Sequence, residues 1–128
     1  MRKYSHDCYL YKLANLYMGI LVGKTIQKTN KEWVTVITFV SIAESYRKRG
    51  IGRYFLEAYM NHIYEKSPEK RHTFICHSLE TSRGFYDKIG FTLVKDGEYE
   101  DQIGILLDIE RTDEIESGYW MKYAMMPI

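Results

Sequence analysis

Apolar and polar positions follow two different periods along the chain, and the period separates predicted strands from predicted helices. Residues 8–13 and 16–22 are apolar and rich in Tyr, Leu, Ile and Val, with a polar break between them. This pattern predicts a β-hairpin. Residues 23–31 are polar, and we expect a turn at 29–31. Residues 33–42 are largely β-branched, which predicts a buried strand.

The period changes after residue 49. Ile51, Phe55, Tyr59 and Ile63 recur every four residues, which predicts an amphipathic helix over residues 50–66. The rest of the chain predicts, in order, a strand at 73–77, a helix at 81–88 closed by Gly90, a strand at 91–95, an acidic turn at 96–101, an extended segment at 103–109 and a strand at 119–126.

Strands thus bracket the helices, which indicates an α/β (α+β) fold with a mixed central sheet flanked by helices. The 128 residues are enough for one domain, so we expect a single domain over residues 1–128. No apolar run reaches the roughly 20 residues that a membrane span needs, and the first residues lack the apolar core of a secretory signal. We therefore expect no membrane association and a cytoplasmic location.

Two cysteines, Cys8 and Cys76, are too few for a disulfide framework, and we expect both to be reduced. His6 lies near Cys8 and His77 follows Cys76, but neither pair has the spacing of a four-ligand metal site, so no metal is expected.

The net charge of +1 argues against a dedicated nucleic-acid binder. The charge is unevenly distributed, however. Residues 1–88 contain 15 Lys and Arg against 8 Asp and Glu, whereas residues 89–128 contain 3 against 9. This asymmetry suits a ligand with an anionic end and a cationic reaction partner, although solvated faces without a binding role explain it equally well.

The segment from residue 40 to residue 53 carries the most chemical information. A strand ends there, a basic loop with two glycines follows, and a helix begins. Gly50 and Gly52 allow close approach of an anion to the backbone, and the free amides of the first helical turn point toward it. Basic side chains in and after the loop add donors; they belong to Arg47, Lys48, Arg49 and Arg53.

Other glycine-rich phosphate loops fit less well. The dinucleotide-binding pattern requires a third glycine, where this chain has Tyr54 and Phe55. The nucleotide-triphosphatase loop requires Gly-Lys-Ser/Thr, which the segment lacks.

With the segment Arg47-Lys48-Arg49-Gly50-Ile51-Gly52 the chain resembles the GNAT (Gcn5-related N-acetyltransferase) family, whose coenzyme A signature is Arg/Gln-x-x-Gly-x-Gly/Ala. A second family segment, Tyr-x-x-x-Gly-Phe, is matched by Tyr86 to Phe91. The two segments are separated by a helix and a strand, as in the family, and the resemblance covers about residues 34–95.

The resemblance implies a GNAT-like fold, acetyl-CoA as co-substrate and a role for each matching residue. Tyr86 would be the general acid at the thioester sulfur. Val40, Ser41 and Ile42 would pair through their backbone with the pantetheine arm. The pyrophosphate would be held by the loop and the helix start, which comprise Arg47, Lys48, Arg49, Gly50, Ile51, Gly52 and Arg53.

The chain departs from the family pattern in three respects. Leu79 stands where relatives often have Asn, and the predicted strand at 34–42 has no carboxylate to serve as a general base. We also expect the family's N-terminal strand and helices to be shortened or missing. His77 and Glu80 are the alternative candidates for the base, and a water chain would also serve.

Two classes of function follow. The first is an N-acetyltransferase acting on a primary amine, on a cationic small molecule or on a protein or peptide. The second is a non-catalytic module that binds coenzyme A or a partner protein. An apolar C-terminal run, residues 119–126, offers a strand edge for pairing and predicts a homodimer.

Overall fold

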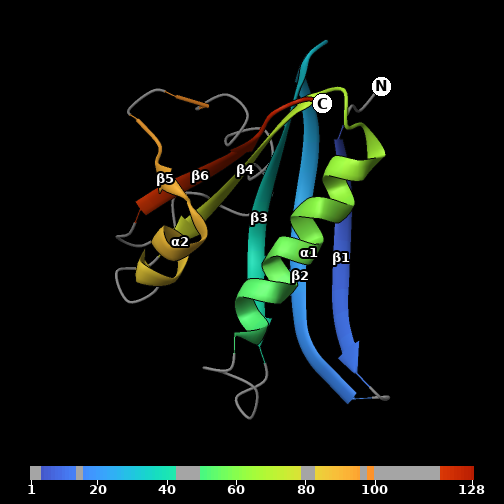
Figure 1. Cartoon of the computed structure of the whole chain (residues 1–128), viewed down its shortest axis with the longest axis vertical. Helices are drawn as coiled ribbons and strands as arrows, with labels where there is room; N and C mark the ends of the chain where they lie inside the picture. The colour runs from blue at the N-terminus through green and yellow to red at the C-terminus, as the bar shows by residue number, and fades with distance from the viewer. Residues whose placement is uncertain (1–3, 14–15, 43–49, 79–82, 96–97, 100–118) are drawn as a thin grey trace.

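The computed structural model of the protein describes residues 4–13, 16–42, 50–78, 83–95, 98–99 and 119–128. One sheet with the strand order β1-β2-β3-β4-β6-β5 forms the centre of the molecule (Figure 1). β3 and β4 are parallel and all other neighbours are antiparallel, which confirms the mixed sheet of the predicted α/β (α+β) fold. The elements are β1 (Tyr4–Leu13), β2 (Leu16–Thr29), β3 (Glu32–Ile42), α1 (Ile51–Lys66), β4 (Arg71–Ser78), α2 (Arg83–Ile89), β5 (Thr92–Leu93) and β6 (Tyr119–Met125).

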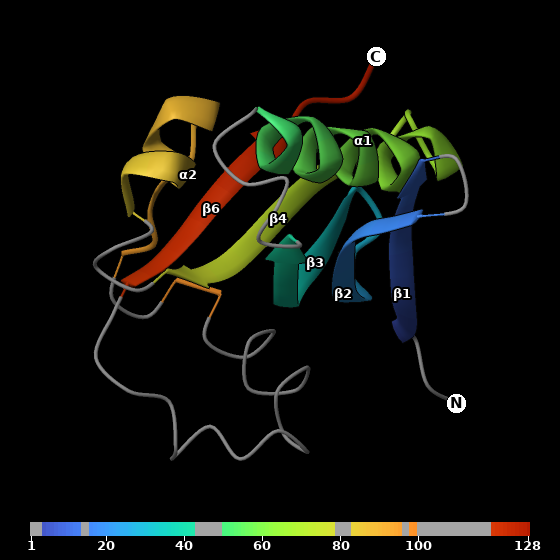
Figure 2. The same ribbon diagram turned by 90° about the horizontal axis from the view of Figure 1, so that it is seen from below.

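Both helices lie on the same face of the sheet (Figure 2). The apolar stripe of α1 is buried against this face through Phe55, Leu56, Tyr59, Met60 and Ile63. A smaller apolar cluster, Val34, Val36, Ile75 and Tyr99, lies on the opposite face, because neighbouring residues of a strand point to opposite sides. None of the helices in the described ranges is long and apolar enough to cross a membrane.

The helix at 50–66 and the strands at 33–42 and 73–77 are confirmed, each to within two residues at its ends. The predicted hairpin is also confirmed, but its first strand begins four residues earlier and its second strand ends seven residues later than predicted. The polar stretch over residues 23–31, in which we expected a turn at 29–31, is therefore mostly strand. β2 continues to Thr29, and only Asn30 and Lys31 form the turn. The polar residues belong to the strand because Thr25 is buried and shares a hydrogen bond with Thr35 across the β2–β3 pair, with 2.8 Å between the two Oγ1 atoms.

The C-terminal part of the sheet also differs from the prediction. The strand expected at 91–95 is reduced to Thr92 and Leu93, and the segment expected at 103–109 lies outside the described residues. β6 is confirmed, but it does not form a free sheet edge as the dimer prediction required. It lies between β4 and β5, and β5 pairs with it at Met121 and Lys122, while the homodimer stays a prediction.

Candidate functional site

The two parallel strands separate in the middle of the sheet. β3 and β4 pair from Glu32 opposite Arg71 to Ile37 opposite Cys76, and the register ends there. Beyond this point β3 continues with β2 alone, whereas β4 continues with β6. Figure 1 shows β4 and β6 turning away from β3 toward α2. Residues 38–42 therefore have β2 on one side and no strand of the described chain on the other.

A β-bulge lies next to this separation. Val22 of β2 pairs with Phe39 and Gly23 pairs with Ile37, which leaves Thr38 as an extra residue in β3. A bulge bends the strand that contains it and increases its local twist. The extra residue directly follows the last pair with β4, so the bulge lies where β3 and β4 separate. Val40, Ser41 and Ile42, the predicted partners of the pantetheine arm, all lie on this diverging end.

The helix that follows the predicted anion loop begins without a side-chain cap. Gly50 is its N-cap, with φ 76° and ψ 0°, and this residue has no side chain that could cap the first turn. The first amide with an acceptor inside the helix is that of Tyr54, which donates to the carbonyl oxygen of Gly50 at 3.1 Å. The amides of Ile51, Gly52 and Arg53 therefore have no acceptor within α1. This arrangement favours an anion at the helix terminus.

The side chains that were predicted to help bind the anion are only partly described. Arg47, Lys48 and Arg49 lie outside the described residues. Arg53 is described, and its guanidinium lies along the helix, where Nε is 3.5 Å from Oε2 of Glu57. Both side chains of this ion pair are about half exposed, so the pair is weak enough to exchange for an anion at the helix terminus.

Tyr86, the predicted general acid, is buried between α2 and the sheet. It is 9% exposed and belongs to the main core cluster, and its ring makes edge contacts with those of Phe85 and Phe91. Cys76 of β4 belongs to the same core cluster. Burial, and then the neighbouring Cys76, raise the pKa of Tyr86 far above its usual value, so the phenol stays protonated. Tyr86 is thus a core residue whose phenol is protonated at neutral pH.

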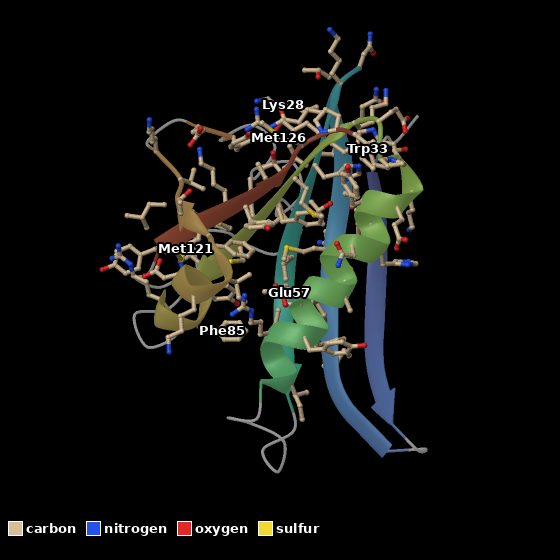
Figure 3. All side chains as sticks on the ribbon, in the orientation of Figure 1. Lys28, Trp33, Glu57, Phe85, Met121 and Met126 are labelled. Atoms are coloured by element: carbon tan, nitrogen blue, oxygen red, sulfur yellow. The ribbon has the colours of Figure 1, made fainter. Side chains whose placement is uncertain are left out.

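α2 ends in a tight turn at Gly90. Gly90 has φ 116°, a conformation that favours glycine, and the amides of both Gly90 and Phe91 donate to the carbonyl oxygen of Tyr86. The predicted stop at Gly90 is therefore confirmed. Figure 3 shows Met121 of β6 beneath α2 and Phe85 on the side of α2 that faces α1.

His77, one candidate base, follows Cys76 on β4 and points to the opposite face. It is half-buried, and its ring lies edge-on to Trp120 at 5.1 Å between centroids. Burial lowers the pKa of the imidazole below 6.5, so the ring is neutral at pH 7. Glu80, the other candidate, lies outside the described residues, as does Leu79.

A groove of about 470 Å³ runs between α1 and β6. It begins at Tyr54, next to the helix start, and continues past Glu57, Ala58 and Asn61 to Tyr123 and Met125. In the described ranges, no group of three or more His, Cys, Asp or Glu side chains is placed to hold a metal ion.

The sequence reasoning did not place Cys76 in the same core cluster as Tyr86. One signal was available. Cys76 and Phe74 alternate along the predicted strand at 73–77, which assigns the thiol to a core-facing side, but the helix that covers this side could not be inferred from the pattern.

Comparisons with known proteins identify the architecture. A family model described as an acetyltransferase (GNAT) domain matches residues 2–106. Tetrahymena Gcn5 aligns with a TM-score of 0.69 at 15% identity, over 96% of this chain and 70% of that chain. Arabidopsis thaliana Naa50, in complex with the bisubstrate analogue CoA-Ac-MVNAL, aligns with a TM-score of 0.59 at 17% identity, over 85% of this chain and 66% of that chain. The PaiA N-acetyltransferase of Thermoplasma acidophilum, in complex with coenzyme A, aligns with a TM-score of 0.58 at 15% identity, over 94% of this chain and 61% of that chain. No curated protein matches the sequence.

Proposed function

Because this chain belongs to the acetyltransferase (GNAT) family, we propose that it is an N-acetyltransferase that moves the acetyl group of acetyl-CoA to a primary amine. The observation that carries the proposal is the divergence of β3 from β4 at the end of the sheet where α1 begins (Figure 1). Two of the similar structures, those of Arabidopsis Naa50 and Thermoplasma PaiA, contain a coenzyme A analogue or coenzyme A, which supports the choice of donor.

The diverging end of β3 suits an extended amide-containing chain. The backbone of Val40, Ser41 and Ile42 offers donors and acceptors on the side that has no neighbouring strand in the described chain. The pantetheine arm contains two amides and pairs there as a short added strand. The separation of β3 and β4 provides the space that this pairing requires.

The pyrophosphate of the coenzyme then lies at the start of α1. The free amides of Ile51, Gly52 and Arg53 provide donors, and the helix dipole favours the negative charge. Arg47, Lys48 and Arg49 supply further positive charge in the proposal. The groove that begins at Tyr54 receives the nucleoside half, because its volume of about 470 Å³ is within the range typical of ligand pockets.

The reaction in this arrangement is a direct transfer. The amine nitrogen attacks the thioester carbonyl, a C–N bond forms and the C–S bond breaks. The electron pair leaves with the coenzyme sulfur, and Tyr86 donates the proton that converts the thiolate into a thiol. The raised pKa keeps the phenol protonated at neutral pH, so its O–H is available as a donor to the sulfur while the C–S bond breaks.

His77 is the base that we assign to the amine. Its lowered pKa makes it a neutral acceptor at pH 7, and it lies on the face of the sheet opposite Cys76. A thioester between the separated strands would have Tyr86 on one side and His77 on the other. Glu80 or a water chain is the alternative route for the proton.

The acceptor that we propose is a cationic amine: a polyamine, an aminoglycoside-like amine, or a lysine or N-terminal amine on a peptide. The excess of carboxylates in residues 89–128 supports this choice. The rate with such an acceptor should decrease as salt increases, because exposed charges are screened beyond about 8–10 Å at physiological ionic strength.

A thiol-release assay with acetyl-CoA and a mixed panel of amines tests the function, with calorimetry of acetyl-CoA binding beside it. Transfer to an amine supports the proposal. Binding of acetyl-CoA without transfer to any amine would instead identify a non-catalytic coenzyme A module, and the absence of binding would refute both.

A further inference from the structure

His77 and Trp120 form a cross-strand pair at the place where the sheet divides. They lie directly opposite each other in the register of β4 with β6. The pairing of β3 with β4 ends one residue earlier, at Cys76, so His77 has β6 on one side and no strand of the described chain on the other. The pair therefore borders the split between β3 and β4.

The rings of the two residues are in contact. Their centroids are 5.1 Å apart and their planes meet at 64°, which is the edge-to-face arrangement that aromatic pairs prefer. Directly opposed residues of an antiparallel pair have their Cβ atoms within about 4.5–5.5 Å of each other on the same face. The contact therefore follows from the register of the two strands.

Trp120 is held in place by groups other than His77. Its side chain packs against the apolar cluster on the face opposite the helices, which includes Val36 and Ile75. Its carbonyl oxygen accepts a hydrogen bond from the amide of Val94 at 2.9 Å. The indole is thus a fixed support on the β6 side of the imidazole.

The charged groups on this face have other partners or lie farther away. Lys122, the next residue of β6 on this face, donates to Glu98, with 2.6 Å between Nζ and Oε2. The remaining ionisable groups placed on this face are Lys24, Lys28, Glu32, Arg71 and Tyr99, and none of them is next to His77 on β4 or opposite it on β6. From Trp33 to Ile42, β3 has no ionisable side chain. The surroundings of the imidazole agree with a pKa that burial alone lowers.

We propose that Trp120 is a positioning residue for the reaction, whose indole ring supports the His77 imidazole at the edge of the split and keeps water from that side of it. This proposal rests on the proposed function, in which His77 takes the proton of the attacking amine. With the indole on the β6 side, the imidazole can be approached from the side of the split. A general base needs this combination of a fixed position and an open approach.

Titration of the four histidines by NMR tests the contact without use of activity. His77→Gln identifies the resonance of His77. Trp120→Ala should let water reach the imidazole and raise its pKa toward the ordinary value of about 6.5, whereas Trp120→Phe keeps a ring in this place and should keep the pKa low. Trp33→Ala is the matched control. Trp33 contacts a different histidine, His72, with 5.7 Å between ring centroids, so the titration of His77 should not change.

Kinetics of the same variants test the role in the reaction. We expect Trp120→Ala to lower kcat by about 10-fold, a part of the roughly 10²–10⁴-fold that a general base contributes, with little change in KM for acetyl-CoA. The acidic limb of kcat/KM should move to higher pH together with the NMR titration of His77, because both report the free enzyme. Trp120→Phe should recover most of the loss, and Trp33→Ala should leave the profile in place.

An unchanged titration of His77 in Trp120→Ala would overturn the proposal, as would an unchanged kcat while His77→Gln is impaired. Equal losses in Trp120→Ala and Trp120→Phe, with a matching decrease in thermal stability and no movement of the acidic limb, would overturn it in favour of packing. An acidic limb that persists in His77→Gln would remove the base and the proposal with it. These results leave the transferase function intact. A wild type that transfers acetyl to no amine refutes that function and the catalytic role of the pair, whatever the titration shows.

Discussion

Tyr59 of α1 packs so closely against Gly23 of β2 that a Cβ on Gly23 would lie 2.0 Å from the tyrosine hydroxyl oxygen. Tyr59 has no exposed surface, and it occupies the centre of the helical stripe that faces the sheet. The missing side chain at position 23 is therefore what allows α1 to approach β2. Gly23 also lies opposite the bulge at Thr38, so the same residue borders the place where β3 begins to bend.

The first prediction concerns this contact. Gly23→Ala should lower the free energy of unfolding by about 1–3 kcal/mol, because the added methyl group must displace a buried aromatic ring. Gly84→Ala is the matched control, since no atom lies within 4 Å of a Cβ placed there in α2. The control should be neutral or stabilising by up to about 1 kcal/mol. Urea unfolding of the two variants makes the comparison, and equal stabilities would contradict the close contact.

The second prediction concerns the anion site. Gly52→Asp places a negative charge in the first turn of α1 and should weaken acetyl-CoA binding by on the order of 100-fold, or about 3 kcal/mol. Asn30→Asp adds the same charge in the turn between β2 and β3, at the opposite end of the sheet (Figure 1). Calorimetry should show a nearly unchanged affinity for this control. If the two variants bind equally well, the coenzyme does not occupy the helix start.

The third prediction concerns the groove between α1 and β6. Asn61 is exposed and lines the groove, so Asn61→Trp should fill it with little strain. We expect KM for acetyl-CoA to increase by about 10-fold, or ~1.4 kcal/mol. KM for acetyl-pantetheine, which has no nucleotide, should stay the same. An equal effect on both donors would show that the substitution acts on the fold and that the nucleoside lies elsewhere.

Most of the fold could be predicted from the sequence because local periodicity determines it. The recurrence of Phe55, Tyr59 and Ile63 marks the buried face of α1, and Gly90 marks the end of α2. The strand over residues 23–29 could not be predicted in this way. Its polar residue Thr25 is satisfied by Thr35 of another strand, and such a partner is known only after the strands are paired.

The helix start of the candidate site was predictable because Gly50 and the apolar residues of α1 lie on one continuous segment. Features that depend on two separated segments were not. The bulge at Thr38 is visible only from the register with β2, and the core cluster that Cys76 and Tyr86 share requires α2 to be placed on β4. Tyr86 was predicted to be the general acid from its motif, but its burial became apparent only from the packing.

The fourth prediction concerns His77. To act as a base the imidazole must be neutral, and burial lowers its pKa below 6.5. The rate should therefore decrease only when the pH falls below this lowered pKa of His77. His77→Gln should remove this acidic limb and lower the rate by about 10²-fold or more. His62→Gln, a substitution at an exposed position of α1, is the control and should leave the profile unchanged. An acidic limb that persists without His77 would point to Glu80 or to water.

The last prediction concerns Tyr86. Tyr86→Phe removes the hydroxyl and keeps the ring that packs against Phe91. Without a proton donor the coenzyme must leave as a thiolate, and kcat should decrease by about 10²-fold or more. The affinity for acetyl-CoA should hardly change, because the donor acts chiefly in the transition state.

Tyr64→Phe is the matched control for Tyr86→Phe. It removes a hydroxyl that donates to the carbonyl oxygen of Met126 at 2.9 Å, on the part of α1 far from its N-terminus. This change should cost about 1 kcal/mol of stability and leave kcat unaltered. Steady-state kinetics and thermal unfolding of both variants distinguish a tyrosine that donates a proton from one that only stabilises the fold. If Tyr86→Phe loses stability but keeps its turnover, Tyr86 is a core residue and the proton reaches the sulfur by another route.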